Sequence, residues 1–273
     1  MTATGERRDP AATRAPEQWE ELAGRWGRLH PQTLWRTYCD ELHTALIERW
    51  MPSERRERVL KTDLFDEIVT DGLYPVLARR AHEVIGMDIA TRAAAQAAGR
   101  HRGLAALAAD ARALPFGDAT FDAIVSNSTL DHFPSLDDLG VAVRELARIT
   151  RRGGVLLLTL DNLANPVVAL RTVLPRVPLK RLGLVPYYCG ATCGPARLRE
   201  IVEGAGFAVD RVEALLHCPR VLAVATARIV ERYGSPATQR RYLRHLTRYE
   251  RLASWPTRER TSYFTAVRAI RVG

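Results

Sequence analysis

Short apolar runs alternate with segments of helical periodicity along most of the chain. The apolar runs at 59–60, 84–87, 103–109, 121–127, 155–160, 207–215 and 264–270 predict strands. Segments at 91–100, 136–149 and 195–205, and a pattern through positions 73, 77 and 81, predict helices. Because the strand at 155–160 has no polar face, we expect a mainly parallel sheet that is covered on both sides. The pattern therefore predicts an α/β fold.

The chain divides into a leader, an N-terminal helical part and one main domain. Residues 1–16 read as a disordered leader, and 17–54 hold two helices, at 18–28 and 33–50. The second has one apolar face through Trp35, Cys39, Leu42 and Leu46. We expect these helices to form a flap over a pocket, or else to pack plainly on the sheet edge. Residues 55–273 form the main domain, with inserts at 161–192 and 219–260.

Composition places the chain among ordinary globular proteins. Its 273 residues are 47% hydrophobic and 26% charged, and no apolar run reaches the roughly 18 residues that a membrane span needs. The N-terminus lacks the apolar segment of a secretory signal. Four cysteines are too few and too scattered for a disulfide framework, and Cys189 and Cys193 lack a second pair that would complete a zinc site. We therefore predict a cytoplasmic protein without a bound metal.

The net charge of +9 is concentrated in the second insert. Residues 219–260 contain ten arginines against three glutamates. One predicted helix there has an apolar face through Tyr242, Leu246, Tyr249 and Ala253, and Arg241, Arg244, Arg248 and Arg251 lie on another face. Such a face suits phosphates, anionic lipid or an acidic partner. The alternative is an ordinary solvated surface.

Polar residues stand where the predicted strands end. Residues 58–88 give a strand, a loop, a helix and a second strand that ends at Asp88, which is the layout of a nucleotide-binding unit. Asp63, Asp110 and the pair Ser126-Asn127 follow other strands. In open α/β sheets, ligands bind beyond the carboxyl ends of the strands. These side chains are therefore candidates for one binding site.

Four short motifs occur in one order along the predicted strands: Val84-Ile85-Gly86-Met87-Asp88, Ala109-Asp110-Ala111 with Leu114-Pro115-Phe116, Phe121 to Asn127, and Arg152-Gly153-Gly154-Val155-Leu156. Their pattern resembles the class I (Rossmann-like) S-adenosylmethionine-dependent methyltransferases over about 59–270. The resemblance implies a seven-stranded, doubly wound, mostly parallel sheet, with helical inserts after the fifth and sixth strands. It also implies S-adenosylmethionine as the cofactor.

The resemblance assigns cofactor contacts residue by residue. Asp88, with Ile89 next to it, takes the ribose, while Asp110 and Ala111 flank the adenine. Ser126 and Asn127 lie beside the methionine part. The first loop departs from the family, because Lys61 to Glu67 contains no glycine and Gly72 comes only at the helix start. We expect side chains to replace backbone contacts there: Lys61 or Thr62 for the cofactor's carboxylate, and Asp63 or Asp71 for its ammonium group.

Candidates on the acceptor side are fewer. His132 is the first choice for a general base and Asp131 the second, although a packing role suits His132 equally well. Tyr187 and Tyr188, in the first insert, would line an aromatic substrate pocket or anchor the loop. The methyl acceptor is predicted to be a small or lipid-like molecule, methylated at O, N or C. The oligomeric state stays open.

Three alternatives to this function stand beside it. The first keeps the reaction but takes RNA or another polyanion as the acceptor. It lacks the Asn/Asp-Pro-Pro-Tyr motif after the fourth strand, which removes the commonest signature for methylating base amino groups. The second is a cofactor fold without methyl transfer that serves as a partner-binding subunit, supported by the irregular first loop. A nicotinamide-dependent reductase is the weakest, because the glycine fingerprint is missing.

Overall fold

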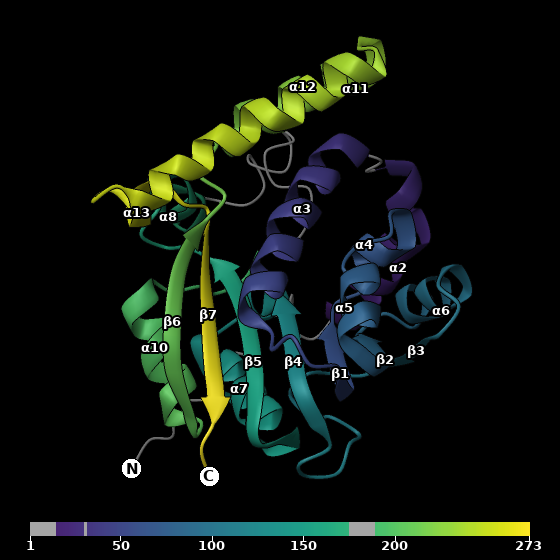
Figure 1. Ribbon diagram of the computed structural model, residues 1–273, viewed down its shortest axis with the longest axis vertical. Coiled ribbons are helices and arrows are strands. Elements are labelled where there is room, and N and C mark those ends of the chain that lie inside the picture. Colours follow the sequence, from purple (N-terminus) through teal and green to yellow (C-terminus); the bar gives the residue numbers. More distant parts are fainter. Residues whose placement is uncertain (1–14, 30–31, 175–188) are drawn as a thin grey trace, which may run out of the picture.

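The computed structural model describes residues 15–29, 32–174 and 189–273. Its centre is one seven-stranded sheet with the order β3-β2-β1-β4-β5-β7-β6 (Figure 1). β7 pairs antiparallel with β5 and with β6, and the other pairs are parallel. The predicted fold class is thus confirmed. The strands are β1 (Arg56–Thr62), β2 (Ala81–Asp88), β3 (Leu104–Ala108), β4 (Phe121–Asn127), β5 (Thr150–Asp161), β6 (Phe207–Leu215) and β7 (Phe264–Arg271).

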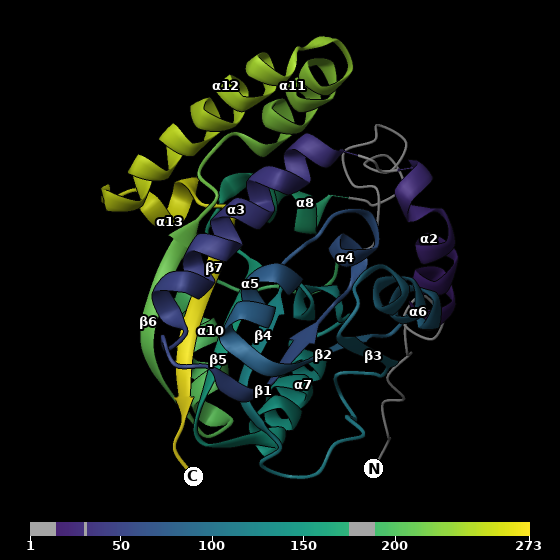
Figure 2. The same cartoon turned by 45° about the vertical axis from the view of Figure 1, so that its right-hand side comes forward.

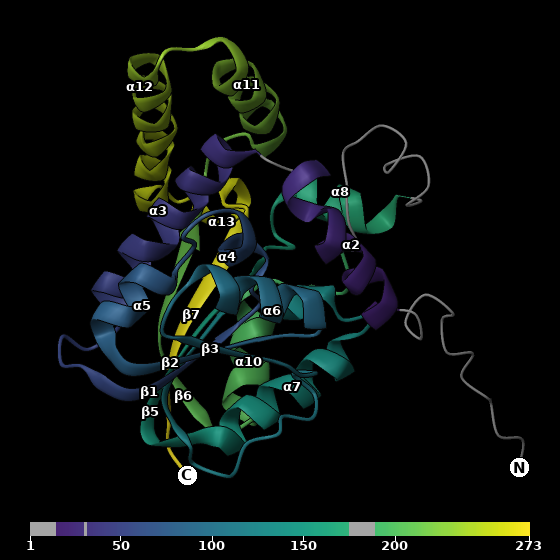
Figure 3. The ribbon, with the colours of Figure 1, turned by 90° about the vertical axis from the view of Figure 1, so that its right-hand side faces the viewer.

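Helices cover both faces of this sheet. In Figure 3, α3 and α5 lie on one side of the sheet, and α7 and α10 on the other. The α-helices are α2 (Ala15–Leu29), α3 (Thr33–Trp50), α4 (Phe65–Val69), α5 (Tyr74–Arg80), α6 (Thr91–Arg100), α7 (Leu136–Ile149), α8 (Pro166–Val173), α10 (Pro195–Gly204), α11 (Arg220–Tyr233), α12 (Pro236–Thr247) and α13 (Arg258–Thr261). Two 3-10 helices, η1 (Leu130–His132) and η2 (Arg248–Ser254), complete the elements of the described chain.

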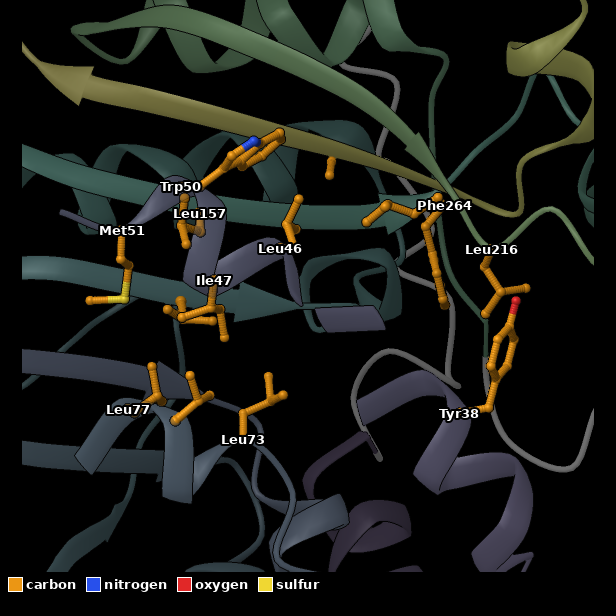
Figure 4. Packing of buried hydrophobic residues seen from close by; sticks show 14 of the residues in the cluster. Tyr38, Leu46, Ile47, Trp50, Met51, Leu73, Leu77, Leu157, Leu216 and Phe264 are labelled. Atoms are coloured by element: carbon orange, nitrogen blue, oxygen red, sulfur yellow. The ribbon is translucent and has the colours of Figure 1, made fainter. Parts of the chain in front are cut away.

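Alternate residues of the central strands feed two separate cores. Leu157 of β5 packs with α3 and α5, whereas its neighbours Leu156 and Leu158 pack with α7 and α10. Figure 4 shows the first core, where Ile47 and Trp50 of α3 face the sheet near Leu157. This two-sided burial explains why β5 has no polar face.

Several predicted boundaries need correction. Ala81, expected on a helix, begins β2, since α5 ends at Arg80. β5 starts at Thr150, so the expected turn Arg152-Gly153-Gly154 lies inside the strand, at an irregularity in its pairing with β4. Gly153 accommodates it with φ = 75°. The predicted N-cap of α7 is confirmed, because the Ser135 side chain accepts a hydrogen bond from Asp138 N.

The N-terminal part and the inserts follow the predicted outline with two differences. α2 begins at Ala15, inside the predicted leader, and positions 1–14 of that leader lie outside the described residues. The second insert holds α11 as well as the predicted basic helix, which ends at Thr247 and continues as η2. Leu246 is buried there, but Ala253 is exposed. Among the described residues, no helix is both long and apolar enough to cross a membrane.

A buried ion pair closes the loop after β1. Lys61 Nζ lies 2.9 Å from Glu67 Oε2, and both side chains are almost fully buried. The ammonium group also donates to the main-chain oxygen of Asp63, and Glu67 Oε1 accepts from Leu73 N at 2.9 Å. Burial acts to lower the pKa of Lys61, but Glu67, Asp63 and Asp66 together outweigh it, so the net pKa is raised. The loop and α4 are therefore fixed by side chains.

We expect Lys61→Met to destabilise the protein by about 3–5 kcal/mol, because it leaves the Glu67 carboxylate buried without its cation. The double variant Lys61→Met/Glu67→Gln should recover a large part of that loss, since the amide oxygen still accepts from Leu73 N. Urea unfolding at neutral pH measures both. A single variant that loses less than about 1 kcal/mol would show that the pair has no structural role.

Candidate functional site

The polar strand ends meet where the strand order of the sheet reverses. β1 lies between β2 and β4, and the chain leaves it in opposite directions for these neighbours. Asp63 follows β1, Asp88 ends β2 and Asn127 ends β4. Ligands bind in α/β sheets at such a switch point. In Figure 2, α3, α8 and α11 are grouped above this end of the sheet.

Asp88 ties the first loop to the end of β2. Its Oδ2 accepts from Leu64 N and its Oδ1 from Ala90 N, each at 2.9 Å. Burial raises the pKa of this carboxyl to about 6, although the two N–H groups act to lower it. A carboxylate offers about four lone-pair sites, so two stay available for a ligand. Asp88 can therefore hold the loop and bind a diol at the same time.

A small cavity of about 80 Å³ adjoins this carboxylate. It is lined by Asp88 and Ile89 after β2 and by Asp110 and Ala111 after β3. Arg112 donates to Asp110 at 2.7 Å and to Asp138 at 3.0 Å. Although burial opposes it, the hydrogen bonds from Arg112 lower the pKa of Asp110. The four residues that the resemblance places around adenosine thus share one cavity.

A larger cavity of about 500 Å³ lies next to it, between the sheet and helices α2, α3, α8 and α11. Trp19, Asp63, Phe65 and His132 line both cavities and form the wall between them. The Trp19 ring centroid is 5.5 Å from that of Phe65 and 4.8 Å from that of His132. The volume of the larger cavity falls in the usual range for ligand pockets, about 300–1,000 Å³, whereas the volume of the small cavity lies below it. Trp19 of α2 therefore controls how far the two spaces join.

Three residues at and after the end of β4 carry buried polar atoms without hydrogen-bond partners in the described chain. Asn127 Oδ1, Ser128 Oγ and Asp131 Oδ1 are buried and have no hydrogen bond to any part of the chain that the structure describes. All three residues line the larger cavity. Ser128, with φ = 49°, and Asp63, with φ = 67°, also adopt a backbone conformation that non-glycine residues rarely take. Unsatisfied buried groups and such conformations concentrate at ligand sites.

Two acids that line the larger cavity have raised pKa values. Burial, reinforced by Asp161, raises the pKa of Asp131 to about 6. Burial and the neighbouring Asp88 raise the pKa of Asp63 well above its usual value. Asp131 Oδ2 accepts from Asp161 N at 3.1 Å, and Asp161 pairs with Arg171 at 2.6 Å. A cationic ligand group would favour the ionised form of these acids.

His43 is a functional candidate that the sequence did not reveal. Its Nδ1 lies 2.9 Å from the main-chain oxygen of Cys39, which can only accept, so Nδ1 carries the proton. Nε2 then keeps its lone pair, 3.5 Å from Thr159 Oγ1, and the ring lines the larger cavity. Burial lowers the pKa of His43 and keeps the ring neutral. The only signal in the sequence was a histidine within an otherwise apolar helix face.

The structure brings most of the predicted site residues together and leaves some outside. Residues that line a cavity are Asp63, Asp88, Ile89, Asp110, Ala111, Asn127, Asp131 and His132. Residues that line neither cavity are Lys61, Thr62, Asp71, Gly72 and Ser126. We call these five residues the second group. Tyr187 and Tyr188 lie outside the described residues.

The second group is held away from the cavities by its own bonds. Lys61 forms an ion pair with Glu67, and Thr62 Oγ1 bonds to Ser126 Oγ at 2.9 Å inside the sheet. Asp71 is exposed and lies 3.6 Å from Arg100. Gly72, with φ = 53°, lies against Glu67. Of the residues expected at the methionine end, only Asp63 and Asn127 reach the larger cavity.

Comparisons with known proteins agree with this geometry. Residues 70–158 match the family model described as a methyltransferase domain. A demethylmenaquinone methyltransferase of Corynebacterium efficiens is 35% identical over 86 residues, which are 32% of this chain and 35% of that protein. Its counterpart in Roseiflexus castenholzii is 38% identical over 82 residues, covering 30% and 29%. The chain thus spans about a third of the length of the curated relatives that it matches.

Solved structures extend the likeness over the whole sheet. The putative methyltransferase in complex with the Haloferax volcanii Trm112 activator has a TM-score of 0.61 at 14% identity, covering 94% of this chain and 97% of that one. The (4+2)-cyclase SpnF has a TM-score of 0.56 at 22% identity, covering 86% and 81%. The chain therefore has the fold of the class I methyltransferases, and its segment 70–158 matches their domain model. The matched segment contains β2, β3, β4 and the residues of the small cavity other than Trp19, Asp63 and Phe65.

We expect Asp88→Ala to destabilise the methyltransferase domain, because Leu64 N and Ala90 N lose a buried acceptor. Each unsatisfied donor costs about 1–3 kcal/mol. Chemical denaturation measures the loss. Asp71→Ala is the matched control and should stay within about 0.5 kcal/mol of the parent, since Asp71 is exposed. Equal stability of the two variants would contradict the structural role of Asp88.

Proposed function

We propose that the protein is an S-adenosylmethionine-dependent methyltransferase that acts on a small, lipid-like acceptor. The observation that carries the proposal is the pair of adjoining cavities at the carboxyl ends of β1, β2 and β4. One is lined by the residues that the family uses for adenosine, and the other is large enough for an acceptor. The family match over 70–158 supports it.

The residues present suit the cofactor. Asp88 has lone pairs left for the ribose diol, and Ile89 and Ala111 offer apolar surface to the adenine ring. Asp63 stands in the wall between the cavities, where its carboxylate would meet an ammonium group, and the free Asn127 Oδ1 and Ser128 Oγ would take further polar atoms. When bound, S-adenosylmethionine supplies a methyl group that is already activated on a sulfonium. At about 80 Å³, the small cavity is below the usual size of ligand pockets, so cofactor binding would require its lining, which includes Trp19 of α2, to open further.

The larger cavity favours an acceptor with an aromatic or apolar body. Trp19, Trp26 and Trp35 line it on one side, and Val167, Leu170 and Val221 line it on another. The relatives that match at 35% and 38% identity are named as demethylmenaquinone methyltransferases. An acceptor of that lipid-like class fits this lining better than a polyanion does. The lipid-like acceptor is therefore part of the proposal.

Three side chains stand ready to take the acceptor's proton. His132 lies in the wall beside Asp63, and Asp131 faces the larger cavity with a free Oδ1. His43 offers an unprotonated Nε2 from α3. General bases work best with a pKa near the working pH, a condition that the pKa of about 6 for Asp131 comes close to meeting. α2 and α3, which line the cavity, would serve as the flap that excludes water.

The test of the proposal is turnover. The purified protein is incubated with S-adenosylmethionine and a series of quinols whose apolar chains increase in length, and S-adenosylhomocysteine is quantified by mass spectrometry. Acceptor-dependent product is expected, and His43→Gln and His132→Gln show which base contributes. The result that would contradict methyl transfer is a protein that binds the cofactor but methylates no acceptor, whether the acceptor offers a phenol oxygen, an amine nitrogen or a nucleophilic carbon atom.

A second candidate function rests on the loop after β1. The loop has no glycine, and SpnF, a structural neighbour, is named as a cyclase. A domain that keeps the cavities but transfers no methyl group is the alternative, whether as a binding subunit or in another reaction. Cofactor-independent conversion or binding of the acceptor would favour it.

Asp63→Asn should weaken S-adenosylhomocysteine binding by about 10- to 100-fold, because a hydrogen bond to a charged group contributes about 1.5–3 kcal/mol. The substitution is nearly isosteric, so the fold should persist. Isothermal titration calorimetry measures the affinity, with Asp71→Asn as a control that binds like the parent. Unchanged affinity in Asp63→Asn would remove Asp63 from the site.

Affinity for S-adenosylhomocysteine should fall as the pH drops below about 6. Burial raises the pKa of Asp88 to about 6, so its carboxyl is protonated below that pH and no longer attracts the ribose hydroxyls as an anion. Each proton that must be released weakens binding by up to tenfold per pH unit. Calorimetry at pH values above and below 6 should show that the affinity of Asp88→Asn for S-adenosylhomocysteine changes less with pH than that of the parent. An affinity of the parent that is constant with pH would contradict the assignment.

A further inference from the structure

The mouth of the larger cavity is bordered by apolar side chains that face solvent. On α8 and directly after it they are Val167, Leu170, Val173 and Leu174, and on α11 they are Val221, Leu222, Ile229 and Tyr233. Val173 is 77% exposed, Leu222 66% and Tyr233 74%. We call these eight residues the mouth surface. Large exposed apolar patches mark interaction sites in soluble proteins.

The mouth surface is continuous with the cavity. Val167, Leu170, Leu174 and Val221 belong to both, since they also line the larger cavity. The side chains of α11 therefore lead from the outside of the protein to the place where an acceptor would bind.

Positive charge without acidic partners surrounds this surface. Arg228 and Arg232 lie on α11 between its apolar residues, and neither has an ion pair among the described residues. The only acid in α8, α11 and α12 is Glu231, which accepts from Thr33 N at 3.1 Å and so points back to α3. Arg240, Arg241 and Arg244 of α12 are exposed and add to the same field. The surface combines apolar contact with a strong attraction for anions.

We propose that the mouth surface docks on the anionic face of a lipid bilayer, and that the acceptor enters the larger cavity from that bilayer. The inference rests on the proposed function in one respect, the lipid-like acceptor. Helices that lie in a membrane interface combine apolar residues with arginines in this way. Anionic lipid also attracts each nearby arginine.

Other occupants fit less well. RNA would be held by the arginines but would leave the valines and leucines of α8 and α11 unused. A second copy of the chain, docked through the same patch on both partners, would bring Arg228 and Arg232 against their own counterparts. A bilayer that contains anionic lipid satisfies both the apolar residues and the charges.

The experiment is co-sedimentation of the whole protein with vesicles. Binding is expected to vesicles of phosphatidylcholine mixed with phosphatidylglycerol, and to be much weaker with phosphatidylcholine alone. Leu222→Ser/Ile229→Ser should lower affinity by about tenfold or more. Arg232→Gln should lower it about fivefold, which corresponds to about 1 kcal/mol per arginine. None of these three residues lines the cavity.

Controls separate the possible outcomes. Arg244→Gln, the same charge change on α12, which carries none of the mouth-surface residues, should have a smaller effect than Arg232→Gln on α11. Two results would overturn the proposal: equal effects of both arginines with no effect of the apolar substitutions, which indicates a general polyanion site, or a dimer in ultracentrifugation that Leu222→Ser/Ile229→Ser dissociates.

A turnover assay distinguishes docking from methyl transfer. With a short-chain acceptor dispersed in water, Leu222→Ser/Ile229→Ser should turn over like the parent. With a long-chain acceptor in anionic vesicles, the variant should be slower by the factor that it loses in binding. Parent turnover without vesicle binding would overturn the docking proposal alone. Vesicle binding without any turnover would leave docking standing and overturn the proposed reaction.

Discussion

The buried ion pair between Lys61 and Glu67 is the contact on which the candidate site depends. Two opposite charges that are removed from water stabilise a structure only when their geometry is good and their remaining bonds are satisfied. Each charged group also has a second polar partner, since Lys61 bonds to Asp63 O and Glu67 Oε1 accepts from Leu73 N. The ion pair fixes the loop after β1 through side chains, so the site does not need a series of glycines in that loop.

What this loop presents follows from that anchor. The chain turns at Asp63 with φ = 67°, and Leu64 N then reaches Asp88 while Phe65 enters the wall between the cavities. The same few residues therefore position the candidate ribose-binding acid Asp88, the candidate ammonium-binding acid Asp63 and the wall between the two cavities. Trp19 rests on Phe65 and His132, so the position of α2 is coupled to both cavities. Movement of α2 would change the cofactor and acceptor spaces together.

The sequence predicted the sheet well because its strands are buried on both faces. A continuous apolar run such as 121–127 predicts a strand when both faces of the sheet are covered. The acids at the strand ends lie together because parallel strands end at one edge of the sheet. α4 was missed, since Phe65 to Val69 is a mixed polar segment whose conformation is set by a tertiary ion pair. The start of β5 was missed because Arg152-Gly153-Gly154 has the composition of a turn.

The details of the site were harder to predict than its location. Lys61 and Thr62 stand at a strand tip, as expected, but which way a side chain points depends on packing that periodicity does not encode. His43 was hidden because its importance comes from the hydrogen bond of Nδ1 to Cys39 O, which fixes the tautomer. The Arg-rich insert was predicted correctly to be basic. The exposed apolar residues of α11 were not predicted, because their role depends on the position of α11 beside α8 at the larger cavity.

The central claim is that a loop fixed by side chains forms a working cofactor site at the ends of β1, β2 and β4. Hydrogen–deuterium exchange with and without S-adenosylhomocysteine tests it most directly. The account predicts slower exchange of the amides at 63–65, 88–90, 110–113 and 127–132, with α12 unchanged. No protection at 63–65 and 88–90, or protection confined to other parts of the chain, would contradict it.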